Sequence, residues 1–288
     1  MKMGLKSSQF PSFSRCRNIA KGDAFIIASG PSAKGFPIEA FAGTPMIAMN
    51  GSISLFQGTG IRPFFYASSD TSFARQQPEL FEQALATSMH VALWPEQIEA
   101  HRALIGGQAF ALQKATQRGP LSPLWPCKDY TWHPTFRRRS RSIGFSRDMA
   151  LGFFDARTVA FLALQLAYHA GFRRVFMVGV DLNQTANRFY EGDDSDKAPC
   201  NFDDHYEHRI LPCFKLLNEL RREHGFEVFN LSAYSRLPED VVPRISMRMA
   251  EAMIAATKPC RQAQPKHTHR VYLCQRSGQQ LPKPCRCC

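Results

Sequence analysis

Residues 155–182 read DARTVAFLALQLAYHAGFRRVFMVGVDL, and this stretch decides the fold that the sequence predicts. Its first half is apolar on almost every side, with Asp155 placed to cap a helix and Gly171 to end it. The run VFMVGV that follows is typical of a strand buried on both faces of a parallel sheet. Gly179 and Asp181 close this strand at the edge where open α/β sheets bind ligands, although Asp181 could equally be a turn-former or a helix cap.

Three apolar runs nearer the N-terminus, at 24–28, 46–49 and 63–67, also end in small polar residues. Those residues are Ser29, Gly30, Pro31 and Ser32 after the first run, Asn50 after the second, and Ser68 and Asp70 after the third. The carboxyl ends of parallel strands meet at one edge of a sheet, so we expect these loops to converge on one cleft. The first loop lacks the glycine and lysine patterns of dinucleotide and Walker loops, so it does not identify the ligand.

The whole pattern predicts an α/β protein with a Rossmann-like, mostly parallel sheet of about six strands and a small lid region. We expect the folded domain to span 23–257, after an N-terminal extension over 1–22 and before a basic, cysteine-rich tail over 258–288 that we predict to be disordered. Hydrophobic periodicity is lost over 106–148, and the segment 183–208 is polar. We expect these two segments to be lid insertions rather than parts of the sheet.

The chain has 288 residues, 44% of them hydrophobic, and a formal net charge of +12. That charge favours an anionic partner, such as a nucleotide, a phosphorylated glycolipid, an inner-leaflet phospholipid or a nucleic acid. No apolar run approaches the ~20 residues that span a bilayer, and the N-terminus lacks the apolar region of a signal peptide. The cysteines Cys127, Cys200 and Cys213 lack metal-site spacing, which predicts free thiols in a cytosolic compartment.

Two polar clusters inside the expected lid are candidate functional groups. The arginine run at 137–141 could bind phosphates of an acceptor, or it could be a solvated basic loop. The segment DDHYEH at 203–208 places His205 and His208 beside carboxylates. A histidine general base is a more economical interpretation than a metal site, because no third ligand is evident, and surface histidines in a loop are the alternative.

Several motifs occur in the same order as in the WaaZ-type proteins, which add a third Kdo sugar to the lipopolysaccharide core. They are AFIIASGPSAKG, MIAMNGS, PFFYASSD, ALGFFDARTVAFLALQLAY, VFMVGVDL, NRFY, and FNLSAYSRL with VVPRI. The likeness covers residues 24–247. More distantly, the GPS loop, Asn50 and the G-x-D turn resemble the bacterial family 42 sialyltransferases. Both groups use CMP-activated 2-keto sugar acids on a Rossmann-like domain with a lid, so the resemblance implies a glycosyltransferase.

The resemblance also implies which residues bind the donor. Residues 29–32 match the nucleotide loop, although Ser29 stands where the sialyltransferases have asparagine. Asn50 matches the asparagine that helps to hold the CMP-sugar. Gly179 and Asp181 match the pair near the cytidine ribose. The Ser-Gly pair that begins the central helix in the sialyltransferases is Asp155-Ala156 here, which departs from the family pattern.

Catalytic groups are implied in the same way. His208, with His205 as the alternative, falls where the sialyltransferases carry their general base. Tyr190 resembles a tyrosine that contacts the leaving phosphate, and Arg188 beside it could stabilise the same negative charge. The second tyrosine of that phosphate pair would fall at Asn183.

We therefore predict transfer of a 2-keto sugar acid, preferably Kdo and otherwise sialic acid, from its CMP donor to a lipopolysaccharide inner-core acceptor, with inversion. The expected partners are the CMP-sugar, a lipid A-core oligosaccharide and an anionic membrane surface, with no nucleic acid. The protein would then be cytoplasmic and peripheral at the inner membrane. No cofactor is expected because the leaving group is a monophosphate, with Mg²⁺ as an optional addition.

Two other functions stay open on the sequence. The strand-end motifs also resemble the DUF115 group, which implies a diphosphokinase that uses ATP, with Mg²⁺ held by Asp181 or Asp70. The third hypothesis is a non-catalytic module that binds a nucleotide-sugar or a membrane surface through the arginine run.

Overall fold

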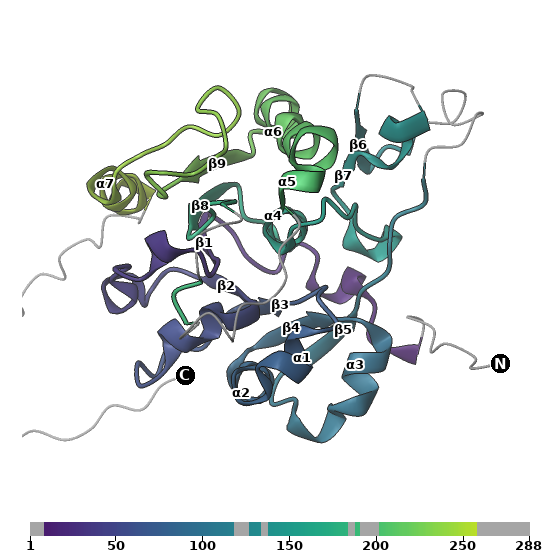
Figure 1. Cartoon of the computed structure of the whole chain (residues 1–288), viewed down its shortest axis with the longest axis vertical. Helices are drawn as coiled ribbons and strands as arrows, with labels where there is room; N and C mark the ends of the chain where they lie inside the picture. Colours follow the sequence, from purple (N-terminus) through teal and green to yellow (C-terminus); the bar gives the residue numbers. More distant parts are fainter. Residues whose placement is uncertain (1–8, 118–126, 134–137, 184–187, 191–201, 258–288) are drawn as a thin grey trace, which may run out of the picture. The chain divides into compact units, whose positions relative to one another are not determined.

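The computed structural model describes residues 9–117, 127–133, 138–183, 188–190 and 202–257. Seven strands form one parallel sheet in the order β5-β4-β3-β2-β1-β8-β9 (Figure 1). These strands are β1 Asp23–Ile27, β2 Met46–Met49, β3 Phe65–Ala67, β4 His90–Leu93, β5 Gln108–Ala111, β8 Arg174–Val178 and β9 Glu227–Asn230. The predicted α/β class with a mostly parallel sheet is confirmed.

Helices lie on both faces of this sheet. The α-helices are α1 Phe73–Gln76, α2 Pro78–Thr87, α3 Pro95–Ala100, α4 Val159–Ala170, α5 Phe202–His205, α6 Leu211–His224 and α7 Met247–Thr257. The 3₁₀ turns are η2 Phe13–Cys16, η3 Pro31–Ala33, η4 Ile38–Phe41, η5 Asn50–Phe56, η6 Arg102–Leu104, η7 Arg138–Ser142 and η8 Met149–Leu151, and η10 Tyr206–Ile210 is π-helical.

Strand β1 illustrates how the sheet serves two hydrophobic cores. Its side chains alternate, so Ala24 and Ile26 join the core beneath α4 and α6, whereas Phe25 and Ile27 join the core beneath α2 and α7. All four side chains are fully buried. Burial on both faces explains why the strand sequence is continuously apolar.

Helix α4 begins three residues later than the sequence predicts. Thr158 is the N-cap residue, and its hydroxyl accepts a hydrogen bond from the backbone N–H of Ala160. The prediction that Asp155 caps the helix is therefore wrong, because its carboxylate instead accepts from the backbone N–H of Arg157 and pairs with Lys114. The predicted end is confirmed: Gly171 ends α4 in the left-handed region, with φ of 109°.

The expectation of an insertion without sheet structure over 106–148 is also wrong in part. Its beginning forms β5, which pairs with β4 at the edge of the main sheet. Further on, β6 Tyr130–Trp132 and β7 Gly144–Ser146 form an antiparallel pair. Phe145 of β7 is fully buried, and the side-chain oxygen of Gln165 in α4 accepts from the backbone N–H of Ser146. This part of the segment therefore packs on α4.

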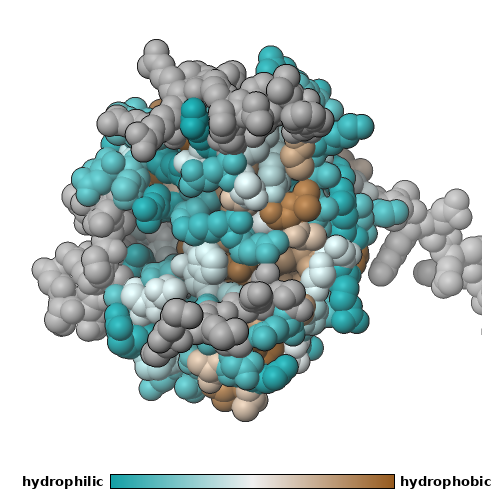
Figure 2. Space-filling model, turned by 90° about the vertical axis from the view of Figure 1, so that its right-hand side faces the viewer, coloured by the Kyte–Doolittle hydropathy of each residue, from teal (hydrophilic) through white to brown (hydrophobic). Residues whose placement is uncertain are grey.

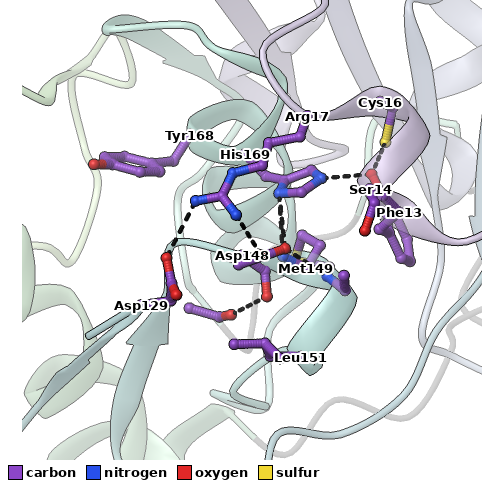
Figure 3. A network of polar contacts seen from close by, with 12 residues as sticks. Phe13, Ser14, Cys16, Arg17, Asp129, Asp148, Met149, Leu151, Tyr168 and His169 are labelled. Carbon is purple, nitrogen blue, oxygen red and sulfur yellow. Dashed lines mark hydrogen bonds and ion pairs between the residues drawn. The ribbon is translucent and has the colours of Figure 1, made fainter. Parts of the chain in front are cut away.

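The N-terminal segment from residue 9 onward packs into the fold (Figure 3). The Nε2 atom of the buried His169 donates to the carbonyl oxygen of Phe13 at 2.7 Å, and its Nδ1 atom accepts from the backbone N–H of Met149 at 3.2 Å. Arg17 donates to Asp148 at 2.5 Å and to Asp129 at 3.1 Å. The segment thus connects β6, η8 and α4.

The face turned toward the viewer in Figure 2 is mostly hydrophilic, with a smaller apolar area beside its centre. This mixture is ordinary for the surface of a folded domain. Among the described residues, no helix has both the length and the apolar character needed to cross a membrane. The predicted tail over 258–288 and much of the predicted lid over 183–208 lie outside the described residues.

Candidate active site

The strand order reverses direction at β1, which pairs with β2 on one side and with β8 on the other. Open parallel sheets bind ligands at such a switch point, outside the carboxyl ends of the strands. Here the backbone N–H of Gly30, after β1, donates to the carbonyl oxygen of Gly179, after β8, at 3.0 Å. A Cβ atom on Gly30 would lie 2.4 Å from a carboxylate oxygen of Asp181, so only glycine fits between the two loops.

Asp181 shapes the loop after β1 directly. Its Oδ2 atom accepts from the backbone N–H of Ser32 at 3.0 Å, and its Oδ1 atom accepts from the Ser32 hydroxyl at 2.5 Å. The Ser32 hydroxyl also lies 2.8 Å from that of Ser232, after β9. Asp181 is only 6% exposed, so its main contacts lie within the protein. The structure therefore brings together the residues predicted to bind the nucleotide around β1 and β8.

The loops after β2 and β3 form the next part of the same edge. The Ser68 hydroxyl donates to the side-chain oxygen of Asn50 at 2.8 Å, which leaves the amide NH₂ group of Asn50 available as a donor. Asn50 has a left-handed backbone, with φ of 45°. Asp70 accepts from both the backbone N–H and the hydroxyl of Ser72, and this fixes the start of the following turn. Asn50 and Ser68 thus meet as predicted.

The segment 188–190 lies against these loops. The backbone N–H of Phe189 donates to the carbonyl oxygen of Ser29 at 3.1 Å. The Tyr190 ring covers Gly51 so closely that a Cβ atom there would lie 2.0 Å from a ring carbon. Tyr190 and its neighbour Arg188, both half-buried, are therefore placed beside the predicted donor loops.

Tyr66 in β3 is a polar group of this region that the sequence analysis did not identify. Its side chain is fully buried, and its hydroxyl has no hydrogen-bond partner among the described residues. Burial raises the pKa of Tyr66 well above its usual value, and the nearby Tyr190 and Asp70 raise it further. The run PFFYA predicts only an apolar strand, so its tyrosine gave no sequence signal of a buried hydroxyl beneath the site.

A polar cavity of about 390 Å³ lies at the other side of the β3 loop. Its lining residues are Lys114, Ala115, Gln117, Ser142, Phe153, Phe154, Asp155, Arg157, His205 and Arg209. His205 therefore borders a space that could admit a substrate, whereas His208 is exposed and does not line it. Of the arginine run, Arg137 lies outside the described residues and Arg141 is half-buried next to Ser142 of the lining.

The cavity floor is fixed by backbone pairing. The N–H of Ala115 donates to the carbonyl oxygen of Phe153 at 2.8 Å, and the N–H of Phe153 donates to that of Gln113 at 2.9 Å. The side-chain oxygen of Gln165, fully buried in α4, accepts from the backbone N–H of Phe154 at 2.9 Å. These contacts join the stretch after β5, helix α4 and the stretch before α4 beside the cavity.

The cavity lining has more basic than acidic side chains: Lys114, Arg157 and Arg209 against Asp155. Lys114 pairs with Asp155 at 2.9 Å, while Arg209 donates to the Asp155 carbonyl oxygen at 2.8 Å and to the Ser142 hydroxyl. Burial alone would raise the pKa of Asp155, but the hydrogen bond from the Arg157 backbone and the contact with Lys114 lower it below its usual value. Asp155 is therefore ionised near neutral pH, and the remaining lining charge is positive.

Two side chains connect the cavity to the strand-end loops. The indole N–H of Trp94 donates to the carbonyl oxygen of Ser69 at 2.9 Å, and the Trp94 ring lies 5.8 Å from that of Phe153. On the other side, the backbone N–H of Arg236 donates to the carbonyl oxygen of Asp181 at 2.9 Å, and its guanidinium group lies 3.9 Å from the Tyr206 ring centre. His205, which lines the cavity, directly precedes Tyr206 in the chain.

The carboxylates that could bind a divalent cation are Asp181 and Asp70. Both oxygens of Asp181 already accept hydrogen bonds from Ser32, and one oxygen of Asp70 accepts two from Ser72. A cation would have to displace some of these contacts. The described residues include no group of three or more histidine, cysteine, aspartate or glutamate side chains with a metal-binding arrangement.

Comparison with known proteins identifies the relatives of this chain. A family model for 3-deoxy-D-manno-octulosonic acid transferase WaaZ matches residues 128–248. A curated relative from Escherichia coli K12, named "Probable 3-deoxy-manno-octulosonic acid transferase", is 24% identical over 245 residues, which cover 80% of this chain and 85% of the relative.

Two solved structures also show similarity to this chain. The glycosyltransferase MAf from Magnetospirillum magneticum AMB-1 is 16% identical, with a TM-score of 0.49, and the match covers 83% of this chain and 38% of that longer one. The sialyltransferase CstII from Campylobacter jejuni, solved with CMP, is 10% identical, with a TM-score of 0.43, and the match covers 76% and 83% of the two chains. The family model and the curated relative both describe transferases of 3-deoxy-D-manno-octulosonic acid, which confirms the predicted glycosyltransferase class, and the chain is similar to the WaaZ-type 3-deoxy-D-manno-octulosonic acid transferases.

Proposed function

We propose that the protein transfers Kdo from CMP-Kdo to an inner-core acceptor of lipopolysaccharide, with inversion at the anomeric carbon. The observation that carries this proposal is the loop Gly30–Ser32, which Asp181 holds against the end of β8 beside Asn50. A loop of small residues at the switch point lets backbone N–H groups approach a nucleotide phosphate. The acceptor would enter from the cavity beside His205.

The chemistry needs three contributions from the protein. The bond between the Kdo anomeric carbon and the CMP phosphate oxygen breaks, and the electron pair leaves with CMP. An acceptor hydroxyl attacks the opposite face of the sugar and loses its proton. The protein must therefore hold the donor, stabilise the negative charge that develops on the phosphate, and accept one proton.

We propose that Tyr190, Arg188 and the backbone N–H groups of the loop 30–32 stabilise the negative charge that develops on the leaving phosphate. Tyr190 lies on Gly51, and the backbone of the segment 188–190 is joined to the same loop through Phe189. A phenol and a guanidinium group are suitable donors to a leaving phosphate. A monophosphate leaving group does not require a metal ion, and Mg²⁺ would be an optional activator.

We propose that His205, rather than His208, accepts the proton of the attacking hydroxyl. His205 lines the cavity and is half-buried, whereas His208 is exposed one helical turn away and outside the cavity lining. A base must reach the attacking hydroxyl through a direct hydrogen bond or one water molecule, so a side chain on the substrate space is better placed.

The decisive experiment incubates the full chain with CMP-Kdo and a lipid A-linked inner-core acceptor, with CMP–sialic acid in a parallel reaction. Mass analysis of the product should show one added Kdo, and released CMP should appear in equal amount. Ligand binding without turnover would instead identify a non-catalytic binding module. Thermal stabilisation by ATP–Mg²⁺ but not by CMP or CTP would contradict the donor and favour the diphosphokinase.

The acceptor proposal includes a membrane location. A lipid A-linked acceptor is held at a bilayer, and a chain of net charge +12 is attracted to anionic headgroups. Sedimentation with vesicles that contain anionic lipid should therefore recover more protein than sedimentation with neutral vesicles, and the difference should fall at high salt.

A further inference from the structure

The cavity beside His205 carries positive charge that the donor chemistry does not use. Lys114, Arg157 and Arg209 line it, and Asp155 is the sole carboxylate among its lining residues. Lys114 pairs with that carboxylate, and Arg209 donates to a backbone carbonyl oxygen and to Ser142. The Arg157 side chain is exposed at the cavity rim, and it forms no hydrogen bond or ion pair with a described residue.

The backbone holds Arg157 in an unusual conformation. Its φ of 63° lies in the left-handed region, which is unfavourable for a non-glycine residue. The Asp155 carboxylate accepts from its backbone N–H at 2.8 Å and so stabilises this conformation. The same carboxylate binds Lys114 with its other oxygen. Asp155 thereby positions two basic residues of the cavity lining, Arg157 and Lys114.

The chemistry of the lining indicates the class of ligand. Lysine and arginine side chains that face a common space bind phosphate or carboxylate groups through charge-assisted hydrogen bonds. A volume of about 390 Å³ is within the range of small-molecule sites and is large enough for a sugar residue with its acidic substituent. A nucleotide base would instead favour an apolar slot, whereas this cavity is lined mainly by polar side chains.

We propose that this cavity binds an acidic group of the acceptor glycan, a phosphate or a carboxylate, and so determines which acceptor hydroxyl reaches His205. The inference rests on the proposed transferase function and adds the acceptor subsite to it. Arg157 and Lys114 are the binding residues, and Asp155 is a positioning residue. The donor would remain at the loops after β1, β2 and β8.

The first test measures anion binding directly on the full chain, with CMP present to occupy the donor site. Inorganic phosphate and free Kdo, which carries a carboxylate, are titrated separately by calorimetry in a low-salt buffer without phosphate. We expect at least one of them to bind to the wild type, and Arg157→Gln and Lys114→Gln each to weaken binding by roughly ten-fold or more. Which of the two ligands binds distinguishes a phosphate from a carboxylate on the acceptor.

Arg102→Gln is the matched control, because Arg102 is an exposed arginine that pairs with Glu99 at 3.7 Å and does not line the cavity. Equal binding by wild type and Arg157→Gln would overturn the inference, and so would the absence of binding by both anions. Each variant is also titrated with CMP alone. A wild type that binds anions but not CMP would overturn the transferase proposal and the acceptor assignment with it.

The second test is kinetic and uses the transfer reaction. Arg157→Gln should raise the KM for the acceptor roughly ten-fold or more, with the KM for the donor and kcat changed little. Removal of phosphate groups from the acceptor should produce the same change in the wild type and no further change in the variant, if the bound group is a phosphate. A loss of kcat with unchanged acceptor KM would contradict the assigned role.

Discussion

Ser32 donates two hydrogen bonds to Asp181, one from its backbone N–H at 3.0 Å and one from its hydroxyl at 2.5 Å. The two residues lie 149 positions apart in sequence and on the loops that follow β1 and β8. The carboxylate therefore fixes the conformation of the proposed nucleotide loop, in addition to any contact with the donor.

Asp181→Ala is expected to reduce both stability and CMP affinity. It removes the acceptor of the Ser32 N–H and one of the two partners of the Ser32 hydroxyl, which costs about 0.5–1.5 kcal/mol for each hydrogen bond lost, because Ser32 itself is exposed. Urea unfolding measures the stability, and CMP titration measures the affinity. Asp240→Ala, at an exposed position, is the control and should change neither quantity. Wild-type CMP affinity in Asp181→Ala would show that the loop does not bind the nucleotide.

Gly51→Ala is expected to displace Tyr190 and to reduce turnover as much as Tyr190→Ala does. The new methyl group would lie 2.0 Å from a carbon of the Tyr190 ring, so the ring has to move. Because both changes act through the same contact, the double variant should be no slower than the slower single variant. Steady-state kinetics of the three variants checks this expectation. Additive losses would mean that Gly51 and Tyr190 act independently.

His205→Ala is expected to lower kcat on the order of 10²–10⁴-fold, with CMP affinity nearly unchanged. His208→Ala serves as its matched control, since that residue is exposed and lies outside the cavity lining, and it should keep near-normal turnover. The reverse result would restore His208 as the base. Near-normal turnover of both variants would place the base elsewhere, and Asp70 would then be the next residue to test.

Stability is expected to decrease below about pH 6.5 partly because of His169. Burial lowers the pKa of this histidine below its usual value, despite the nearby Asp148, and the nearby Arg17 lowers it further. The unfolded chain therefore binds a proton that the folded chain resists. The contribution of neutral His169 to the free energy of unfolding is fully present above pH ~6.5, the usual pKa of a histidine in an unfolded chain. It is lost as the pH falls toward the lower pKa of His169 in the folded protein.

Urea unfolding between pH 5.5 and 7.5 measures this effect in wild type and His169→Gln, where glutamine keeps a donor and an acceptor but does not titrate. The variant should show a shallower loss of stability at low pH. Burial also lowers the pKa of His90 and His224, so part of the pH dependence remains in both proteins. Identical slopes in the two proteins would contradict a role for His169.

The sequence predicted the sheet well because each central strand is a short apolar run that ends in small polar residues. It predicted the start of α4 wrongly because Asp155 and Thr158 are both good capping residues, and the choice depends on Lys114, which lies in another segment. The pair β6–β7 was missed because strands of three residues among prolines and aromatics show no usable periodicity.

The strand-end part of the candidate site was predictable from a general rule about parallel sheets. The cavity was not, because Lys114, Ser142, Asp155 and His205 come from four segments with no common motif. Only the tertiary structure shows which of two neighbouring histidines faces that space. The sequence likewise did not predict the burial of Phe13 or the hydrogen bond between its carbonyl oxygen and His169. That hydrogen bond joins residues more than half of the chain apart.

The central position of β1 has a consequence for how the protein folds during synthesis. Its partner β2 follows within about twenty residues, but its other partner β8 pairs Phe25 with Phe176. At roughly 5–20 residues per second, the ribosome needs on the order of ten seconds or more to deliver that second partner. Until then the nascent sheet has an open apolar edge at β1, and the nascent chain in this interval is the form most exposed to aggregation and to chaperone binding.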